Sequence, residues 1–471
     1  MADHILMADN YSIYVDKISE NVLKADFENI DKETLENAKN RILDLIGCSI
    51  GGADGPGNKA IIDLVKSWGG KEESTIFVHG GKVPAHNAAM INSIMARSYD
   101  FEAIGAFVDD VDLPSHISVT TVMTALALGE ARNVSGKELI TALLIGDDIA
   151  CRLLAASNFG FTLGWDGNGT VNAFGATAIA GRLLGLTQTQ MQNAFGIVLN
   201  QLAGSFQNIW DGSLCFKLPC ALSARNGIFS AELSKAGWDG PRDALFSKFG
   251  YFHLYTEGYN NPEILIKDLG KRFYTEATFK PYPCCRANHA AIDCALKIVN
   301  EHEVDIGNIE DIVLKVPPRV RDMFVGQPFK IRQNPQIDAA FNLRFCVANV
   351  FLRKKITVDH FQEKLISEPG ISDIAGKVQV EGFDPHEQNK RVAALTVRMK
   401  DGKEYFSQVD YPKGGPVYNK LSYEEIKEKF RWNVAYTKKI SENHAEKIIA
   451  LIDNLEEVEK ISELIKLLAV D

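Results

Sequence analysis

Residues 279–289, with the sequence FKPYPCCRANH, concentrate side chains that can do chemistry. Five of them can carry charge, transfer a proton or attack an electrophile: Lys280, Cys284, Cys285, Arg286 and His289. Two cations and an imidazole on one short segment suit an anionic substrate that has to lose a proton. The alternative is an ordinary domain linker, because Pro281 and Pro283 are typical of such a connection.

The adjacent cysteines leave two roles open. Neighbouring residues do not easily form a relaxed disulfide, so a position that lines the substrate or supports the structure is favoured. Nucleophilic catalysis by Cys285 is the alternative, because Arg286 and His289 could lower the pKa of its thiol.

A second candidate group flanks an acidic loop. Asp100 lies in the run YDFE at the end of one predicted helix, and His116 begins the next helix after the loop AIGAFVDDVDLPS. A carboxylate and an imidazole at the two ends of one loop can meet in space, with the histidine as base and Asp100 orienting it. The alternative is a solvated loop in which Asp112 or Ser115 caps the following helix.

Two further segments place polar groups at predicted helix starts. Residues 164–170, GWDGNGT, are a glycine-rich turn whose spacing matches neither dinucleotide-binding nor phosphate-binding loops, so a nucleotide site is disfavoured. The free N–H groups at such a helix start would still suit a carboxylate. Lys217 opens an apolar, alanine-rich helix, where a lysine is either a surface residue with a buried stem or a specifically placed charge.

The elements that position these residues are predicted to be mostly helices. Apolar residues recur at helical spacing in several segments: 14–48, 85–98, 117–133, 136–156, 172–184, 188–204 and 217–236. Asp31 is predicted to cap the helix that follows it. Alanine and glycine are frequent in these helices, which predicts close helix–helix packing in a buried bundle.

The pattern changes near residue 270. Runs typical of strands are 304–316, 377–380, 392–399 and 405–409. Asp401-Gly402 between the last two runs predicts a β-hairpin. Helical patterns follow at 337–352, at 358–366 and, after Ser422, in YEEIKEKFRW and 442–468.

These patterns predict a mainly α fold built from two domains, as expected for a chain of 471 residues. A large helical domain is expected over residues 1–275 and is completed by residues 421–471. A smaller α+β domain is expected over residues 276–420.

The composition disfavours several classes of protein. The formal net charge of −10 argues against binding to nucleic acid or to an anionic membrane surface. No apolar run of about eighteen residues predicts a transmembrane helix, and the acidic N-terminal segment lacks the pattern of a signal peptide. The eight cysteines have no zinc or iron–sulfur spacing, which predicts that they bind no metal. In a large acidic chain without an export signal, they are predicted to be reduced thiols of a cytoplasmic protein.

Several segments together resemble the MmgE/PrpD family, which includes 2-methylcitrate dehydratase, cis-aconitate decarboxylase and an iminodisuccinate epimerase. The motifs are SYDFE at 98–102, SHIS at 115–118, the turn and helix GWDGNGTVNAFGATAIAGRLLGL, FKLPCALSARNGIFSAELSKAGWDGP at 216–241, KPYPCCRANHAAIDCAL at 280–296 and AAFNLRFCVANVFL at 339–352. The resemblance covers nearly the whole chain. It implies a helical domain with a smaller lid-like α+β domain, a homodimer, no metal or organic cofactor, and a small di- or tricarboxylate substrate.

Carried over residue by residue, the resemblance assigns catalytic roles to Asp100, His116, Lys217, Lys280 and His289. The decarboxylase-like members carry histidine at two positions where this chain has Asp166 and Cys285. Together with Arg286, these two residues are the candidate substrate-binding positions, and Asp166 is alternatively a helix cap. The loop between Asp100 and His116 is also several residues longer than is usual in the family.

The family reactions share a carbanion-like centre beside a carboxylate, whose growing charge needs nearby cations. Lys217, Lys280 and Arg286 are the candidate cations, and His116 and His289 the candidate acid and base. The chain is therefore predicted to be a cofactor-independent hydro-lyase of a small hydroxy-di- or tricarboxylate, similar to 2-methylcitrate dehydratase. The alternatives are an epimerase, isomerase or decarboxylase of a small dicarboxylate, or a non-catalytic ligand-binding relative. The non-catalytic alternative would be favoured if Lys217, Lys280 and His289 did not share one pocket.

Overall fold

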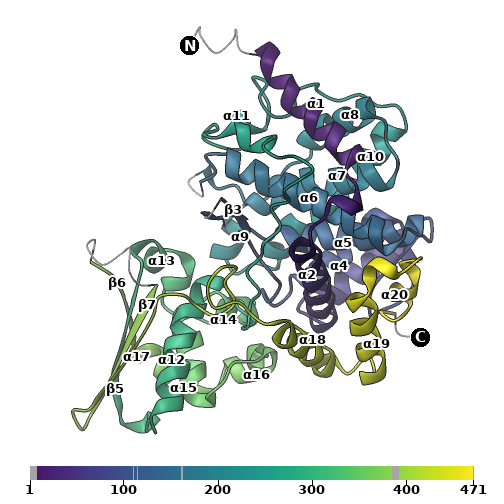
Figure 1. Ribbon diagram of the computed structural model, residues 1–471. Helices are drawn as coiled ribbons and strands as arrows, with labels where there is room; N and C mark the ends of the chain where they lie inside the picture. The colour runs from purple at the N-terminus through teal and green to yellow at the C-terminus, as the bar shows by residue number, and fades with distance from the viewer. Residues whose placement is uncertain (1–7, 110, 114, 161–162, 385–391, 470–471) are drawn as a thin grey trace.

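The computed structural model describes residues 8–109, 111–113, 115–160, 163–384 and 392–469. These residues form a large helical part and a smaller α+β part that lie side by side (Figure 1). The mainly α fold class is thus confirmed. Within the described residues, none of the helices combines the length and the apolarity that a bilayer crossing requires.

The helical part is built mainly from long helices. Its elements are α1 (Ala8–Lys24), α2 (Lys32–Gly51), α3 (Asn58–Trp68), α4 (Ala85–Ala96), α5 (Ile117–Arg132), α6 (Gly136–Ala156), α7 (Val171–Leu183), α8 (Gln188–Leu199), α9 (Gln207–Trp210), α10 (Leu218–Lys235) and α11 (Tyr251–Leu254). The central helices pack as closely as their small residues predict. A Cβ atom on Gly175 of α7 would lie 2.6 Å from the carbonyl oxygen of Gly146 on α6, so only glycine allows this approach.

The acidic loop before α5 is not merely a solvated connection. Within it, β3 (Ala106–Val108) and β4 (Val111–Leu113) form a short antiparallel hairpin. Asp109, beside the turn, accepts hydrogen bonds from Lys267 Nζ at 3.0 Å and from the Tyr274 hydroxyl at 3.1 Å. This loop therefore contains a short hairpin anchored to the helical part.

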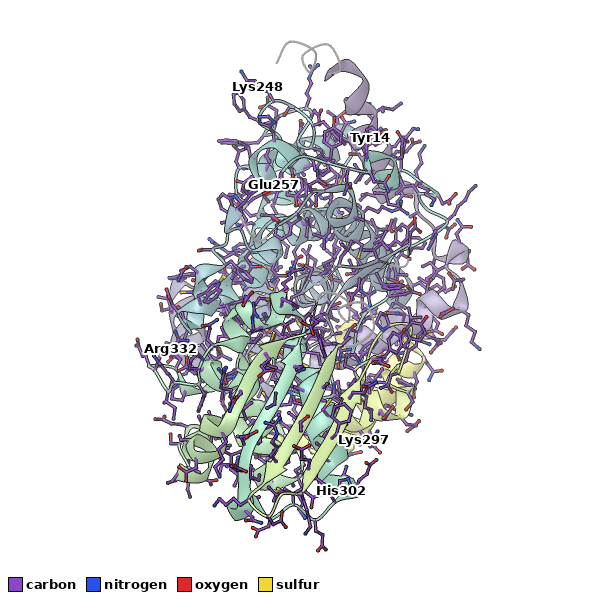
Figure 2. The ribbon with its side chains drawn as sticks, turned by 90° about the vertical axis from the view of Figure 1, so that its left-hand side faces the viewer. Tyr14, Lys248, Glu257, Lys297, His302 and Arg332 are labelled. Carbon is purple, nitrogen blue, oxygen red and sulfur yellow. The ribbon has the colours of Figure 1, made fainter. Side chains whose placement is uncertain are left out.

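The α+β part contains a four-stranded sheet in the order β6-β5-β7-β8. Its strands are β5 (Ile309–Val316), β6 (Val378–Gly382), β7 (Ala393–Met399) and β8 (Glu404–Val409). β5 pairs with β6 in parallel and with β7 antiparallel, and the predicted Asp401-Gly402 turn joins β7 to β8. α12 (His289–Glu301), α15 (Leu343–Arg353) and α17 (Pro369–Lys377) lie on the inner side of the sheet, whose other face points outward (Figures 1 and 2).

The C-terminal helices return to the helical part. α18 (Tyr423–Thr437), α19 (Glu442–Asp453) and α20 (Ser462–Lys466) follow the sheet, and α18 lies along α2. One apolar cluster joins buried residues between 14 and 279 with others between 421 and 468. A second cluster lies mainly between residues 284 and 399. These clusters support the predicted division of the chain into 1–275 with 421–471 and 276–420, which we retain as a proposal.

Some helix boundaries differ from the predictions. The predicted helix 337–352 is two helices, α14 (Pro335–Ala340) and α15, because the Asn342 side chain caps the second by accepting from Phe345 N. The segment 442–468 is likewise interrupted between α19 and α20 by a 3₁₀ turn at Leu455–Glu457. The predicted helix 358–366 is a 3₁₀ turn at Val358–Phe361 followed, after Gln362, by α16 (Glu363–Ile366). The Asp31 cap is confirmed, since its side chain accepts from Thr34 N at 2.9 Å.

A buried lysine of α18 forms an ion pair with α2 and a hydrogen bond with the loop that contains Phe101. Lys429 Nζ lies 2.6 Å from Asp44 Oδ1 and donates to the Phe101 carbonyl oxygen at 2.6 Å.

Lys429→Ala is expected to lower the free energy of unfolding by about 3–5 kcal/mol, because it leaves the Asp44 carboxylate buried without its partner. The control Arg431→Ala, which breaks an exposed pair on the same helix, should cost at most about 1 kcal/mol. Equal urea unfolding curves for the two variants would contradict this assignment.

Candidate active site

A cavity of about 850 Å³ lies between the two parts of the protein. The helical part contributes Arg97, Asp100, His116, Asp166 and Asn168, among others, to its wall. The α+β part contributes Lys280, Cys285, Arg286, Arg319 and the segment around Tyr411–Tyr418. A cavity of this size at a domain interface is the usual place for a small-molecule site.

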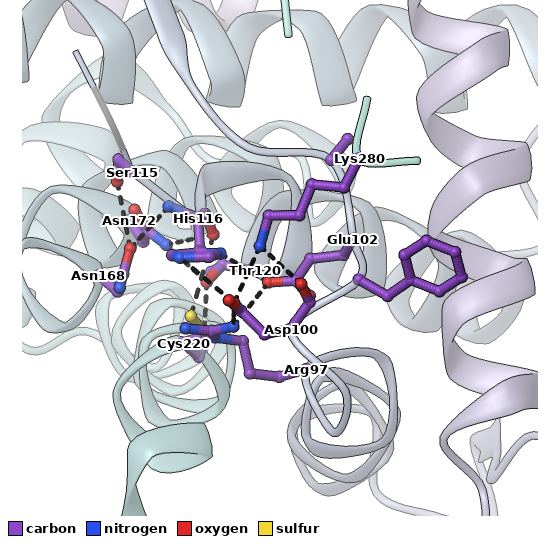
Figure 3. Close-up of polar contacts among 12 residues, drawn as sticks. Arg97, Asp100, Glu102, Ser115, His116, Thr120, Asn168, Asn172, Cys220 and Lys280 are labelled. Carbon is purple, nitrogen blue, oxygen red and sulfur yellow. Dashed lines mark hydrogen bonds and ion pairs between the residues drawn. The ribbon is translucent and has the colours of Figure 1, made fainter. Parts of the chain in front are cut away.

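Five charged or ionisable side chains meet at the buried end of this cavity: Arg97, Asp100, Glu102, His116 and Lys280 (Figure 3). Arg97 Nη1 contacts the carboxylate of Asp100 and lies 3.0 Å from Glu102 Oε1. Lys280 Nζ lies 3.0 Å from Asp100 Oδ1 and donates to the Asp100 carbonyl oxygen at 2.7 Å. Each carboxylate is therefore paired with at least one buried cation.

The chain turns sharply at Asp100 to bring these groups together. Asp100 has a backbone φ of 50°, in the left-handed region that few residues other than glycine adopt, just after the end of α4. Aspartate tolerates this conformation better than most residues, and such backbone strain is frequent at functional sites. The turn points the carboxylates of Asp100 and Glu102 toward the same guanidinium group, that of Arg97.

His116 is held at the start of α5 by three neighbours. Its Nδ1 lies 2.6 Å from Glu102 Oε1, and its backbone N–H donates to Asn168 Oδ1 at 2.7 Å. Asn172 Nδ2 donates to the His116 carbonyl oxygen at 3.0 Å. The other ring nitrogen, Nε2, lies on the side of Asp100, 3.8 Å from its Oδ1. The imidazole is thus fixed in position and in orientation.

The electrostatic surroundings give His116 the character of a base. Burial, reinforced by the positive charge of Arg97, lowers the pKa of His116 below its ordinary value. Burial alone would raise the pKa of Glu102, but Arg97, Lys280 and His116 together hold it below its usual range. An ionised Glu102 accepts a hydrogen bond from the N–H group at His116 Nδ1, so that Nε2 of the neutral ring carries a free lone pair.

The structure corrects one predicted pairing. The carboxylate bonded to His116 is Glu102, not Asp100, which instead contacts Arg97 and Lys280. Glu102 and Arg97 were missed as site residues, although both stand within three residues of Asp100 in the sequence. Spacing alone could not identify them, because the unusual backbone at Asp100 decides which carboxylate reaches the imidazole.

Six of the predicted site residues line the cavity: Asp100, His116, Asp166, Lys280, Cys285 and Arg286. The capping role of Asp166 is observed, since its side chain accepts from Asn168 N at 3.0 Å and caps a 3₁₀ turn, and its role in substrate binding stays a prediction. Burial raises the pKa of Cys285 to about 12, which keeps its thiol protonated and argues against a nucleophilic role.

Arg286 is already engaged by the protein backbone. Its Nη1 donates to the Lys413 carbonyl oxygen at 2.5 Å and its Nη2 to that of Pro412 at 3.1 Å. Two of its N–H donors therefore hold the segment that closes one side of the cavity, and binding of a substrate carboxylate by Arg286 stays a prediction.

Lys217 and His289 are buried but do not line the cavity. Lys217 Nζ donates to the Pro56 carbonyl oxygen at 2.6 Å and to Asn58 Oδ1 at 2.7 Å, and burial lowers its pKa to about 7. His289 lies behind Arg286, with its Nδ1 3.2 Å from Arg286 Nη1 and its Nε2 3.2 Å from the Cys284 carbonyl oxygen. Of the five catalytic candidates, only Asp100, His116 and Lys280 therefore line the cavity.

One group of side chains has the composition of a metal site. Among the described residues, Asp100, Glu102 and His116 offer ligand atoms that all lie within 4.8 Å of one another. Arg97 and Lys280 already pair with these carboxylates, and their positive charges would repel a cation. The arrangement suits an anionic ligand better than a metal ion.

Comparisons with known proteins agree with this arrangement of two domains. A model of the MmgE/PrpD N-terminal domain matches residues 16–263, and a model of the MmgE/PrpD C-terminal domain matches residues 282–457. The second match includes α18 and α19, although these helices pack on the helical part.

Curated relatives are similar along most of their length. Cis-aconitate decarboxylase of Homo sapiens is 26% identical over 456 residues, which are 92% of this chain and 90% of that protein. The cis-aconitate decarboxylase of Mus musculus is 25% identical over 455 residues, covering 92% and 89% of the two chains. The enzyme of the same name from Aspergillus terreus is 23% identical over 467 residues, covering 94% and 93%.

Proposed function

This chain belongs to the MmgE/PrpD family, and we propose that it is a lyase that removes a proton from the carbon next to a carboxylate. The reaction then expels a leaving group, and water from a small hydroxy-di- or tricarboxylate is the leaving group we favour. The observation that carries the proposal is the contact of 2.6 Å between Glu102 Oε1 and His116 Nδ1, which leaves His116 Nε2 as a base.

Each step of this reaction has a candidate group in the cavity. His116 Nε2 accepts the α-proton, and the electron pair moves first toward the substrate carboxylate, where Arg97 and Lys280 offset the growing negative charge. The pair then forms the new double bond as the carbon–oxygen bond to the hydroxyl breaks. The departing hydroxyl needs a proton to leave as water, and Lys280 is the candidate donor.

A hydroxyl-bearing substrate is supported by a buried acceptor. Asp100 Oδ2 is buried, and among the described atoms it has no hydrogen-bond partner. Buried carboxylate oxygens nearly always accept a hydrogen bond, so a ligand donor such as a hydroxyl group would complete this site. An epimerase of the same carbon acid would need no such contact to a leaving group.

Decarboxylation of cis-aconitate is the second candidate, favoured by the names of the relatives. A decarboxylase has to protonate a carbanion, whereas the lowered pKa of His116 leaves little of the protonated imidazole at neutral pH to act as the donor. The criterion for a non-catalytic relative is met in part, since Lys217 and His289 lie outside the cavity. Lys280 nevertheless shares the cavity with His116, so the groups for proton transfer are present.

Proton exchange tests the proposal without knowledge of the net reaction. The wild type is incubated with malate, citrate, 2-methylcitrate and other small hydroxy-carboxylates in deuterated water, and NMR follows label at the α-carbon. At least one compound is expected to gain deuterium or to lose water. Absence of both for every compound would contradict the proposal, and itaconate from cis-aconitate would favour the second candidate.

We further propose a homodimer in the cytoplasm that needs no metal or organic cofactor. The family resemblance supports the dimer and the absence of a cofactor. All eight cysteines are free thiols in the structure, as expected in a reducing compartment.

A further inference from the structure

One wall of the cavity is made of apolar side chains. Four residues from both sides of the domain interface form it: Phe206, Ile209, Phe324 and Phe341. The rings of Phe206 and Phe324 lie 5.8 Å apart between centroids, and those of Phe324 and Phe341 lie 5.7 Å apart. These aromatic contacts make the wall a continuous surface rather than a set of isolated side chains.

This apolar wall begins beside the charged end of the cavity. The ring of Phe341 lies 5.4 Å from that of Phe216, and the guanidinium carbon of Arg97 lies 5.0 Å from the Phe216 centroid. Arg97 in turn pairs with Asp100 and Glu102. A ligand whose carboxylate is held near Arg97 and Lys280 therefore has its next atoms within reach of the aromatic wall.

The cavity is large for a compact polycarboxylate. Its volume of about 850 Å³ lies toward the upper end of the range of roughly 300–1,000 Å³ for sites that enclose drug-sized ligands. A four- to six-carbon di- or tricarboxylate would leave water against Phe324 and Phe341, and contact between water and apolar surface is unfavourable.

We propose that the cavity binds a carboxylate whose carbon skeleton carries a hydrophobic substituent, an alkyl or aryl group of several carbons. The carboxylate end lies among His116, Arg97 and Lys280, and the substituent lies along Phe341, Phe324 and Phe206. This inference rests on the proposed function, because that function places the carboxylate end. It adds the substrate class, namely substituted rather than unsubstituted di- or tricarboxylates.

A series of 2-alkylsuccinates tests this substrate class on the wild-type protein. Methyl-, propyl- and pentylsuccinate share one dicarboxylate end and differ only in the length of the tail, and calorimetry gives the Kd of each. The Kd is expected to fall by about fourfold for each methylene that the wall buries. Equal Kd values along the series, or weaker binding with longer tails, would overturn the inference.

Variants of the apolar wall test whether this wall causes the dependence of Kd on tail length. Phe324→Ala should weaken binding of pentylsuccinate at least about tenfold more than binding of methylsuccinate, because several tail carbons lose their contact. Phe229→Ala, which removes an exposed ring on α10 away from the cavity, should keep the wild-type dependence on tail length. A dependence on tail length that survives in Phe324→Ala would overturn the assignment to this wall.

Proton exchange of the same compounds separates this inference from the proposed function. Tail-dependent Kd values without deuterium incorporation would support the apolar subsite while contradicting α-proton abstraction. Deuterium incorporation without tail dependence would support α-proton abstraction and overturn the subsite.

Discussion

Replacing His116 by glutamine is expected to lower the rate of α-proton exchange by about 10²–10⁴-fold, the usual contribution of a general base. Glutamine keeps the size of the side chain, but its amide cannot accept a proton at the position of His116 Nε2. Deuterium incorporation followed by NMR measures the loss. His444→Gln, at a partly buried histidine of α19 that does not line the cavity, is the matched control and should exchange at the wild-type rate. Exchange in His116→Gln within about threefold of the wild type would contradict the role of His116 as the base.

The lowered pKa of His116 predicts how the reaction rate depends on pH. Burial and Arg97 lower the pKa of His116 below its ordinary value, so the neutral form that accepts a proton predominates at pH 7. The rate should be constant around neutral pH and should fall only as pH drops through this lowered pKa. Glu102→Gln removes the carboxylate that favours the charged ring, so the midpoint of this fall should move to a still lower pH. Glu446→Gln, which changes an exposed carboxylate, should leave the profile unchanged.

Much of the helical framework could be predicted from the sequence because it depends on local periodicity. The predicted segment 136–156 coincides with α6, whose start at Ser135 is fixed by a side chain that accepts from Glu138 N. The Asp401-Gly402 hairpin was equally predictable, since Gly402 has a φ of 84°, which the turn requires. Helix ends were less predictable, as the break at Asn342 shows, because one capping side chain can divide a continuous apolar pattern.

The site was predictable at the level of segments but not at the level of contacts. His116 and Lys280 were placed correctly in one cavity because their segments carry recognisable motifs. The choice between Asp100 and Glu102 as partner of His116 depended on the backbone conformation of one residue. Lys217 is buried, as expected of a specifically placed charge. Its ammonium group points toward Asn58, which lies far away in the sequence, and the sequence pattern could not show this.

Substitutions at Asp166 and Cys285 are expected to change the class of reaction that the protein catalyses. Both residues line the cavity, and the family resemblance implies histidine at these two positions in decarboxylase-like members. Burial raises the pKa of both side chains, but neither supplies an imidazole that could protonate a carbanion near neutral pH. When ionised, Asp166 also adds a negative charge that repels a tricarboxylate more than a dicarboxylate. The wild type is therefore expected to form little itaconate from cis-aconitate.

The double variant Asp166→His, Cys285→His should gain this activity, by at least about tenfold if one new imidazole donates its proton in the transition state. The matched double variant Asp166→Asn, Cys285→Ser removes the same charge and thiol without adding a proton donor. A gain confined to the histidine variant would assign the effect to proton donation, whereas equal gains in both would assign it to the charge of Asp166. Chromatography of itaconate after incubation with cis-aconitate measures all three proteins. Robust itaconate formation by the wild type would contradict the expectation, because the present cavity would then protonate the carbanion without either histidine.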